Sequence, residues 1–365
     1  MTGSETDRPG RPGGSRNDPD YFVGCLLGGA VGDALGAPVE FIALAEIRRR
    51  FGSGGIRGFS PAYGKLGAIT DDTQMTLFTA EGLLRADNRF REKGIGHPPT
   101  MIHHAYLRWL ETQGEQPRYP YAGVRDGWLL GLAALRDQRA PGTTCLSALR
   151  GGLMGTVAEP INGSKGCGGV MRIAPVGLAS ADPFDLGCEA AAITHGHPSG
   201  FLAAGFFAAV IGAIVDGADL GWAIAAATDT LRGRPGSSEC QRAVDGATRL
   251  ARSAPATAES VERLGAGWIA EEALAIALFC ALKAESFEQG VVLAVNHGGD
   301  SDSTGAMTGN LLGALWGRSA IPTAWLDALE LRAEIETLAV DLFRHFGAAE
   351  PLGGDAADWA RYPGW

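Results

Sequence analysis

Apolar residues in this chain recur mainly at the spacing of helices, and the alternating pattern of β-strands is scarce. There is no βαβ rhythm and no fixed repeat of about 20–50 residues. Apolar spacing or alanine richness predicts helices at 73–86, 100–110, 127–136, 183–193, 200–215, 223–231, 259–282 and 325–346. We therefore predict an all-α fold, with a compact single domain over about residues 21–348.

Glycine forms two regular series near the two ends of that domain. The series are Gly24, Gly28, Gly32 and Gly36, and Gly305, Gly309, Gly313 and Gly317. Both step by four residues, so each would line one helical face with no side chains. Because glycine costs ~1 kcal/mol at each helix-interior position, we expect close helix–helix contact. A crossing of these helices or their neighbours would bring the residues just before Gly305 toward Asp33 and Glu40.

The two ends of the chain have a different composition. Residues 1–20 are rich in Gly, Pro and Arg without the apolar segment of a signal peptide, so we predict a disordered lead. Residues 349–365 are predicted to form an irregular tail. The longest apolar run, 201–215, is shorter than the ~18 residues of a membrane span, which predicts a buried core helix and no membrane partner.

Composition narrows the class of protein. The chain has 365 residues, 45% of them hydrophobic and 20% charged, and a net charge of −10. These values are typical of a soluble globular protein and argue against nucleic acid or a membrane surface as the main partner. A small phosphorylated ligand is compatible with them, because a local pocket need not share the global sign. Six cysteines without a CxxC pair predict reduced thiols in a cytoplasmic protein.

Two short acidic clusters lie far apart in the sequence. They are Thr70-Asp71-Asp72-Thr73 and Asp300-Ser301-Asp302-Ser303-Thr304. Crowded carboxylates repel one another unless a cation or a proton intervenes, and hard divalent cations prefer oxygen ligands. We therefore predict one metal site assembled from both ends of the fold. The alternatives are a helix start capped by Thr70 and an ordinary Asp/Ser turn.

A glycine-rich loop at 163–172 is a candidate anion site. Its backbone N–H groups could surround a phosphate, with Lys165 or Arg172 adding charge, although the Walker ending is absent and a simple turn is the alternative. His195 follows a predicted helix and is interpreted either as part of a turn or as a ligand contact, because zinc-site spacing is missing. Glu40 follows a proline, in a loop that could direct it to a site or into solvent.

Together these motifs resemble the ADP-ribosylglycohydrolase family, of the dinitrogenase-reductase-activating and mammalian ADP-ribosylhydrolase type. The matching segments are GDALGAPVEF at 32–41, TDDTQM at 70–75, SKGCGGVMRIAPVGL at 164–178, TH at 194–195 and GGDSDSTGAMTGN at 298–310. They run in family order over roughly residues 22–318. The resemblance implies an all-α fold with a central binuclear Mg²⁺ site, for which Mn²⁺ could substitute.

The resemblance also assigns roles by position. The implied metal ligands are Thr70, Asp71, Asp72, Asp300, Asp302 and Ser303, the last standing where the family usually has threonine. The implied substrate-binding residues, for the diphosphate of ADP-ribose, are Gly166, Cys167, Gly168, Gly169, Val170 and Met171, with His195 nearby. Glu40 corresponds to a flexible-loop glutamate near the reactive ribose. We expect Glu40, Asp71 and Asp302 to be catalytic.

The function implied is magnesium-dependent hydrolysis of the N- or O-glycosidic bond between ADP-ribose and an acceptor, chiefly a mono-ADP-ribosylated protein side chain. Nucleic acid enters only as a modified substrate. Two rivals stay open. A metal-dependent phosphohydrolase would release AMP or phosphate, and a non-catalytic ADP-ribose-binding or immunity protein would bind without turnover.

Overall fold

A computed structural model describes residues 16, 18–348 and 355–364, and within these ranges the chain forms helices and two isolated β-bridges but no strand. The all-α prediction is thereby confirmed. The α-helices are α1 Pro19–Gly36, α2 Leu44–Phe51, α3 Asp71–Lys93, α4 Pro98–Thr112, α5 Thr143–Arg150, α6 Ala174–Ala179, α7 Pro183–Ala192, α8 Pro198–Val215, α9 Leu220–Arg232, α10 Ser238–Ser253, α11 Ala258–Glu262, α12 Ala270–Lys283, α13 Phe287–Val295, α14 Ser301–Trp316, α15 Thr323–Ala328, α16 Arg332–Leu342 and α17 Ala356–Arg361.

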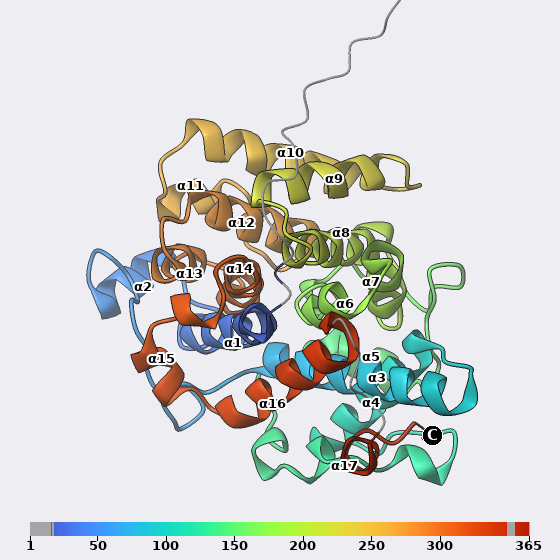
Figure 1. Cartoon of the computed structure of the whole chain (residues 1–365). Coiled ribbons are helices and arrows are strands. Elements are labelled where there is room, and N and C mark those ends of the chain that lie inside the picture. Colours follow the sequence, from blue (N-terminus) through green and yellow to red (C-terminus); the bar gives the residue numbers. More distant parts are fainter. Residues whose placement is uncertain (1–15, 17, 349–354, 365) are drawn as a thin grey trace, which may run out of the picture.

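Helices α1 and α14 lie side by side in the middle of the fold (Figure 1). Their glycines face each other so closely that side chains are excluded: a Cβ built on Gly28 would lie 2.3 Å from the carbonyl oxygen of Gly309. A Cβ on Gly32 would lie 2.0 Å from the carbonyl oxygen of Gly305. The helices run antiparallel, so the predicted crossing of the two glycine series is confirmed, and the end of α1 meets the start of α14.

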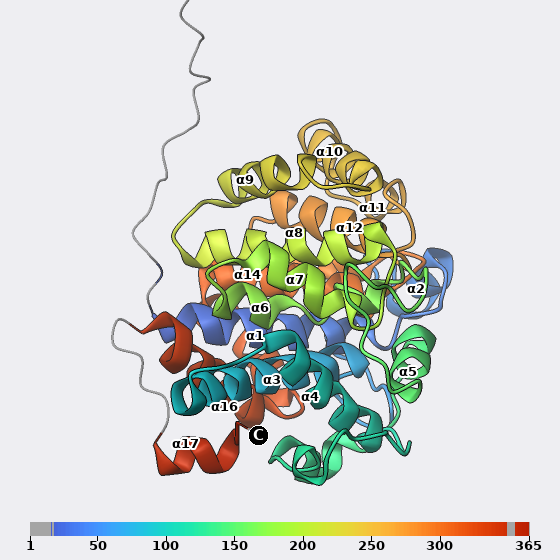
Figure 2. The same cartoon turned by 90° about the vertical axis from the view of Figure 1, so that its right-hand side faces the viewer.

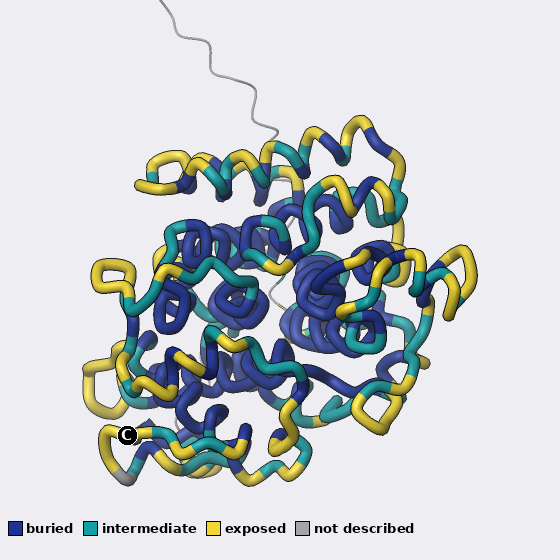
Figure 3. Tube along the Cα trace, turned by 180° about the vertical axis from the view of Figure 1, so that it is seen from behind, coloured by how far each residue is buried: buried dark blue, intermediate teal, exposed yellow. Residues whose placement is uncertain are grey.

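The other helices surround this pair in layers (Figure 2). Helices α8 and α12 cover one side, with α9 and α10 outside them, while α3 and α16 cover the opposite side. Buried residues fill the middle of the fold and exposed residues follow the outer loops (Figure 3). This arrangement places the α1–α14 pair, and the acidic residues at its end, deep in the protein.

Helix α8 extends the apolar run predicted at 201–215 to an 18-residue helix. Among the described residues it alone has the length and composition to cross a membrane. Because 72% of it is buried inside the fold, it has the surroundings of a core helix, as predicted.

Several predicted helix boundaries are wrong. Residues 127–136 form two short 3-10 turns, Leu129–Gly131 and Ala133–Leu135, instead of an α-helix. The segment 259–282 is split into α11 and α12 by a loop with Gly265 at φ +117° and Gly267 at φ +83°. The segment 325–346 is split into α15, α16 and a π-helical turn, with Leu331 at φ +55°. Left-handed backbone ends a helix.

The predictions for the two ends fall largely outside the described residues. Of the lead at 1–20, residues 1–15 and 17 are not described, but α1 begins at Pro19 with Asp18 as its N-cap, so the lead is shorter than predicted. Of the tail, 349–354 and 365 are not described. Within the rest, α17 is helical, so the prediction of an irregular tail is wrong there; the side chain of His345 hydrogen-bonds Asp358 and holds this helix.

Candidate active site

A cavity of about 340 Å³ lies where α1, α3 and α14 meet. It is lined by Glu40, Phe41, Asp71, Asp72, Ala140, Pro141, Gly142, Thr143, Thr144, Cys145, Gly166, Cys167, Gly168, Met171, His195, Trp268, Asp300, Asp302 and Ser303. The cavity therefore brings together the two acidic clusters, Glu40 and part of the glycine-rich loop, as the sequence predicts.

The first acidic cluster forms the start of α3, which a buried carboxylate on α1 holds in place. Asp33 accepts hydrogen bonds from the backbone N–H of Thr70 at 3.0 Å and of Thr73 at 3.1 Å, and from the Thr73 hydroxyl. On the cavity side, Asp71 accepts the N–H of Gly142 at 3.2 Å. Asp33 thus finds the partner that a charge on an apolar helix requires, and it positions the cluster.

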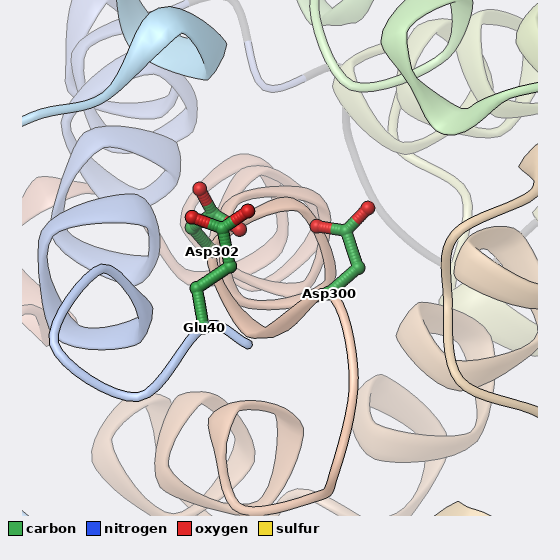
Figure 4. Close-up of side chains that lie close together, drawn as sticks. All are labelled: Glu40, Asp300 and Asp302. Carbon is green, nitrogen blue, oxygen red and sulfur yellow. The ribbon is translucent and has the colours of Figure 1, made fainter. Parts of the chain in front are cut away.

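The second acidic cluster forms the start of α14. Asp300 is its N-cap, and the Ser303 N–H is 3.0 Å from Asp302 Oδ1. The Cys167 thiol donates to Asp300 Oδ2 at 2.7 Å. Glu40 reaches the same place from the loop after α1: one carboxylate oxygen from each of Glu40, Asp300 and Asp302 lies within 4.8 Å of the others (Figure 4).

These carboxylates share a buried environment without a positive side chain of the chain itself, since no Lys or Arg is among the described lining residues. Burial, followed by repulsion from Asp302, raises the pKa of Glu40 to about 11 and that of Asp33 to about 7. The same causes raise the pKa of Asp71 and of Asp72 well above the usual range. Such a cluster needs protons or a bound cation to be stable.

The residues present fit a hard divalent cation. Glu40 Oε2 and Asp72 Oδ1 are buried and have no hydrogen-bond partner in the structure. Unpaired buried oxygens are costly unless something binds them. The donors gathered here are carboxylate and hydroxyl oxygens, the ligand type that Mg²⁺ and Mn²⁺ take in proteins.

A neighbouring part of the cavity wall offers backbone N–H groups, and it lies close to the carboxylates: the N–H of Gly142, the N-cap of α5, bonds Asp71, and the Cys167 thiol bonds Asp300. The first turn of α5 lines it through Thr143 to Cys145 and has no capping side chain, so its N–H groups lack an acceptor inside the helix. The glycine-rich loop lines the cavity through Gly166, Cys167 and Gly168. A helix N-terminus and a glycine-rich loop attract anions, so this part suits a phosphate or diphosphate.

His195 lies against the glycine-rich loop and is buried, not solvent-facing. Its Nδ1 lies 2.8 Å from the Thr194 hydroxyl, within hydrogen-bonding distance. Burial and the nearby Arg172 lower the pKa of His195 to about 3. The imidazole is therefore neutral at physiological pH, and it contributes a polar but uncharged surface to the wall of the cavity.

Several predicted residues are not at the cavity. Gly169 and Val170 lie behind the loop, and Thr70 is a buried N-cap whose hydroxyl accepts the Asp72 N–H, so a ligand role for Thr70 stays a prediction. Lys165 instead forms ion pairs with Glu239 and Glu271.

The charge proposed for Arg172 is also misplaced. Its guanidinium is buried over the Tyr106 ring and donates to Thr194 Oγ1, so it does not reach the cavity. The segment 118–128 contributes no described residue to the lining. The wall is formed instead by 140–145, which no motif in the sequence marks.

Two aromatic residues of the lining, Phe41 and Trp268, are absent from the sequence prediction. Phe41 directly follows the motif glutamate, which is the one signal that could have identified it. Trp268 lies in a loop that was expected to be helical, so the sequence pattern gave no indication of its position.

Comparison with known proteins shows the family of the chain. The family model for ADP-ribosylglycohydrolase matches residues 15–351. The chain is 28% identical to the ADP-ribosyl-[dinitrogen reductase] glycohydrolase of Rhodospirillum rubrum, over 87% of this chain and 92% of that protein. It is 24% identical to the ADP-ribosylarginine hydrolase Tri1 of Pseudomonas putida, over 89% of this chain and 78% of that protein.

A solved structure, titled ADP-ribosylglycohydrolase-related protein complex, matches with a TM-score of 0.64 and 31% identity, covering 90% of this chain and 98% of that one. The family model thus matches nearly the whole chain, and this solved structure shares its fold. The chain therefore belongs to the ADP-ribosylglycohydrolase family, a membership that supports hydrolysis of ADP-ribose linkages as its activity.

Proposed function

We propose that this protein is a magnesium-dependent hydrolase that cleaves the glycosidic bond between ADP-ribose and an acceptor, chiefly a modified protein side chain, and releases ADP-ribose. One observation carries the proposal: Glu40, both acidic clusters and an anion-binding wall line a single cavity. The acidic part and the N–H-rich part match the two ends of an ADP-ribosyl group, whose ribose carries hydroxyls and whose diphosphate carries negative charge.

The residues that would hold the metal are the lining carboxylates of Asp71, Asp72, Asp300 and Asp302, with the hydroxyl of Ser303. Thr70, which does not line the cavity, is proposed as a ligand only from its position in the motif. Bound there, Mg²⁺ would supply Lewis-acid chemistry and offset the negative charge of the cluster. Mn²⁺ has the same ligand preference and is expected to substitute for it.

The chain's own groups orient the substrate. The diphosphate is repelled by the carboxylates and attracted to the first turn of α5 and the glycine-rich loop, so the substrate enters in one direction. The distal ribose then lies beside the acidic cluster. Asp33 acts through its hydrogen bonds to the start of α3, as a positioning residue for Asp71 and Asp72.

In the reaction, the oxygen of a water bonds to the anomeric carbon while the bond from that carbon to the acceptor breaks. Glu40 takes the proton of the water, because its carboxylate, which a bound cation would keep ionised, has an unpaired oxygen and faces the same space as Asp302 (Figure 4). The surrounding carboxylates favour the positive charge that develops on the ribose. The leaving acceptor takes up the proton that Glu40 received from the water, so the products are ADP-ribose and the unmodified acceptor.

The test is incubation of the purified chain with a mono-ADP-ribosylated protein, with and without Mg²⁺, followed by chromatography of the small products. We expect ADP-ribose to be released with Mg²⁺ only. Release of AMP would instead favour the phosphohydrolase, and retention of substrate without turnover would favour a binding protein.

The matched variants are Asp302→Ala, in the cluster, and Asp245→Ala, an exposed carboxylate on α10. Asp302→Ala should reduce turnover by roughly a thousandfold or more while leaving the helical circular dichroism unchanged. Asp245→Ala should retain wild-type turnover. Full turnover by Asp302→Ala would contradict the assignment.

A further inference from the structure

Phe41 and Trp268 form an exposed aromatic pair on the wall of the candidate active site. Their rings are stacked, with centroids 5.2 Å apart and an interplanar angle of 19°. The exposed fraction is 67% for Phe41 and 40% for Trp268, and both line the cavity. Large apolar side chains gathered in the open beside a pocket mark a binding surface more often than a structural contact.

Each ring is carried by backbone that also holds a part of the acidic end. Phe41 has φ +64°, a left-handed conformation that a bulky residue rarely adopts, and it directly follows Glu40. The carbonyl of Trp268 accepts the N–H of Cys167 at 3.1 Å. The preceding Gly267, at φ +83°, lies so close to Asp300 that a Cβ there would be 3.3 Å from the Asp300 Cβ. The pair is therefore fixed beside Glu40 and Asp300.

This location determines which part of a substrate the rings can meet. The rings lie beside Glu40 and Asp300, where the distal ribose is proposed to bind, and they are exposed to solvent. The substrate group that meets them is therefore the one attached to that ribose, which is the leaving group. An aromatic face stacks well on flat, delocalised groups and attracts cations. The lining carboxylates, without a Lys or Arg among the described lining residues, add a preference for positive charge.

We propose that Phe41 and Trp268 form a platform that binds the leaving group and selects a flat cation, a guanidinium, over an aliphatic hydroxyl. The proposal rests on the proposed function and specifies its acceptor. It makes Phe41 and Trp268 specificity-determining residues, with no part in the bond-breaking step.

The experiment compares two peptides of matched sequence, one carrying ADP-ribose on an arginine guanidinium and the other on a serine hydroxyl. We expect wild-type kcat/KM to be higher on the arginine-linked peptide. Phe41→Leu and Trp268→Leu should each lower that value about tenfold and change the serine-linked value less than twofold. Trp268→Phe, which keeps a ring, should stay close to wild type. Inhibition by free ADP-ribose should change less than twofold, because that product lacks the leaving group.

The matched control is Phe90→Leu, the same substitution at an exposed phenylalanine on α3 that does not line the cavity. It should leave both substrates unaffected. An equal loss on both peptides, a parallel loss of ADP-ribose inhibition, or higher activity on the serine-linked peptide would each overturn the platform. Wild-type protein that releases ADP-ribose from neither peptide would overturn the proposed function for these linkages and the platform with it.

Discussion

Helix α3 carries buried acids at two places, and the fold treats them in opposite ways. In its middle, the carboxylate of Glu81 is fully buried and accepts hydrogen bonds from Arg108, with Nη2 at 2.8 Å and Nε at 3.1 Å. Arg85 lies nearby and pairs with Asp126 at 2.7 Å. At its start, Asp71 and Asp72 are equally buried but meet other carboxylates and no described arginine or lysine.

The difference shows that this fold provides arginine partners for a buried acid that has a purely structural role. Arg108 takes both of its hydrogen bonds to Oε2 of Glu81, and Oε1, which accepts no hydrogen bond, lies 3.6 Å from Nε of Arg85, so two arginines balance the charge of Glu81. Asp71 and Asp72 have no arginine or lysine among the described residues that line their cavity, and Asp72 Oδ1 has no hydrogen-bond partner, so their countercharge has to come from protons or from a bound cation. We interpret the first arrangement as structural and the second as preparation for binding.

The largest effect is expected from a substitution that breaks the ion pairs of Glu81 with its arginines. Glu81→Gln leaves Arg108 buried without its countercharge and should lower the free energy of unfolding by about 3–5 kcal/mol. Asp72→Asn removes a repelled charge and should leave stability in a metal-free buffer unchanged or raised. Urea denaturation with a chelator present measures both. Similar losses in the two variants would show that the clusters do not differ in this way.

The next largest effect is expected when bound Mg²⁺ supplies the missing positive charge to the acids of the cavity. At a Mg²⁺ concentration a hundred times its Kd, binding should stabilise the wild-type protein by about 2.7 kcal/mol, seen as a rise in the thermal unfolding midpoint. The rise should vanish in Asp302→Asn and persist in Asp245→Asn. A persistent rise in Asp302→Asn would place the ion elsewhere.

A smaller effect is expected from a substitution that moves the two acidic clusters of the site apart. In Gly28→Ala the new Cβ would lie 2.3 Å from the Gly309 carbonyl oxygen, so α1 and α14 must move apart. We expect a loss of about 1–3 kcal/mol in stability and lower ADP-ribose release, because Asp302 shifts relative to α3.

Gly246→Ala is the matched control for this substitution. Gly246 lies inside α10 with open space around it, so alanine should stabilise the protein by up to about 1 kcal/mol. Equal effects of the two substitutions on unfolding would argue against close helix contact as the reason for the glycine series.

The smallest effect concerns another acid of α3, Asp87, which is paired with the titratable side chain of His345. Burial opposes protonation of His345, but its hydrogen bonds to Asp358 and Asp87 outweigh burial and raise its pKa to about 9. A raised pKa contributes stability that is complete below pH ~6.5 and is lost as the pH rises to about 9.

His345→Gln should therefore be less stable than wild type at pH 6, by roughly 1–2 kcal/mol, and the difference should shrink toward pH 9. Unfolding free energies measured across that range test this. A difference that grows with pH would show that His345 is neutral in the folded protein.

The sequence was most informative where a residue type had few explanations. Glycines stepping by four inside helices need close contact, which is why α1 and α14 could be paired before their structure was known. Asp33 on an apolar helix needs a partner, and it has one at the start of α3. The two acidic clusters could likewise be assigned to one place, because crowded carboxylates have few stable surroundings.

It was least informative where tertiary contacts determine the backbone. Gly265 and Gly267 divide a long alanine-rich segment, but a glycine alone does not reveal that its φ is positive. The cavity wall at 140–145 and Trp268 come from loops whose positions depend on helices elsewhere in the fold. Arg172 and Lys165 were expected to face an anion. In the structure, the Arg172 guanidinium lies over an aromatic ring and Lys165 pairs with two glutamates, so both positive charges have partners outside the cavity.

The contact between α1 and α14 has a consequence for the synthesis of the protein. A ribosome makes α1 long before α14, so the candidate active site cannot exist in a partly made chain that lacks α14. Until then, the bare glycine face of α1 and its apolar neighbours have no partner and are exposed to aggregation. We expect chains that end before residue 300 to need chaperones and to lack activity, whatever helices they have already formed.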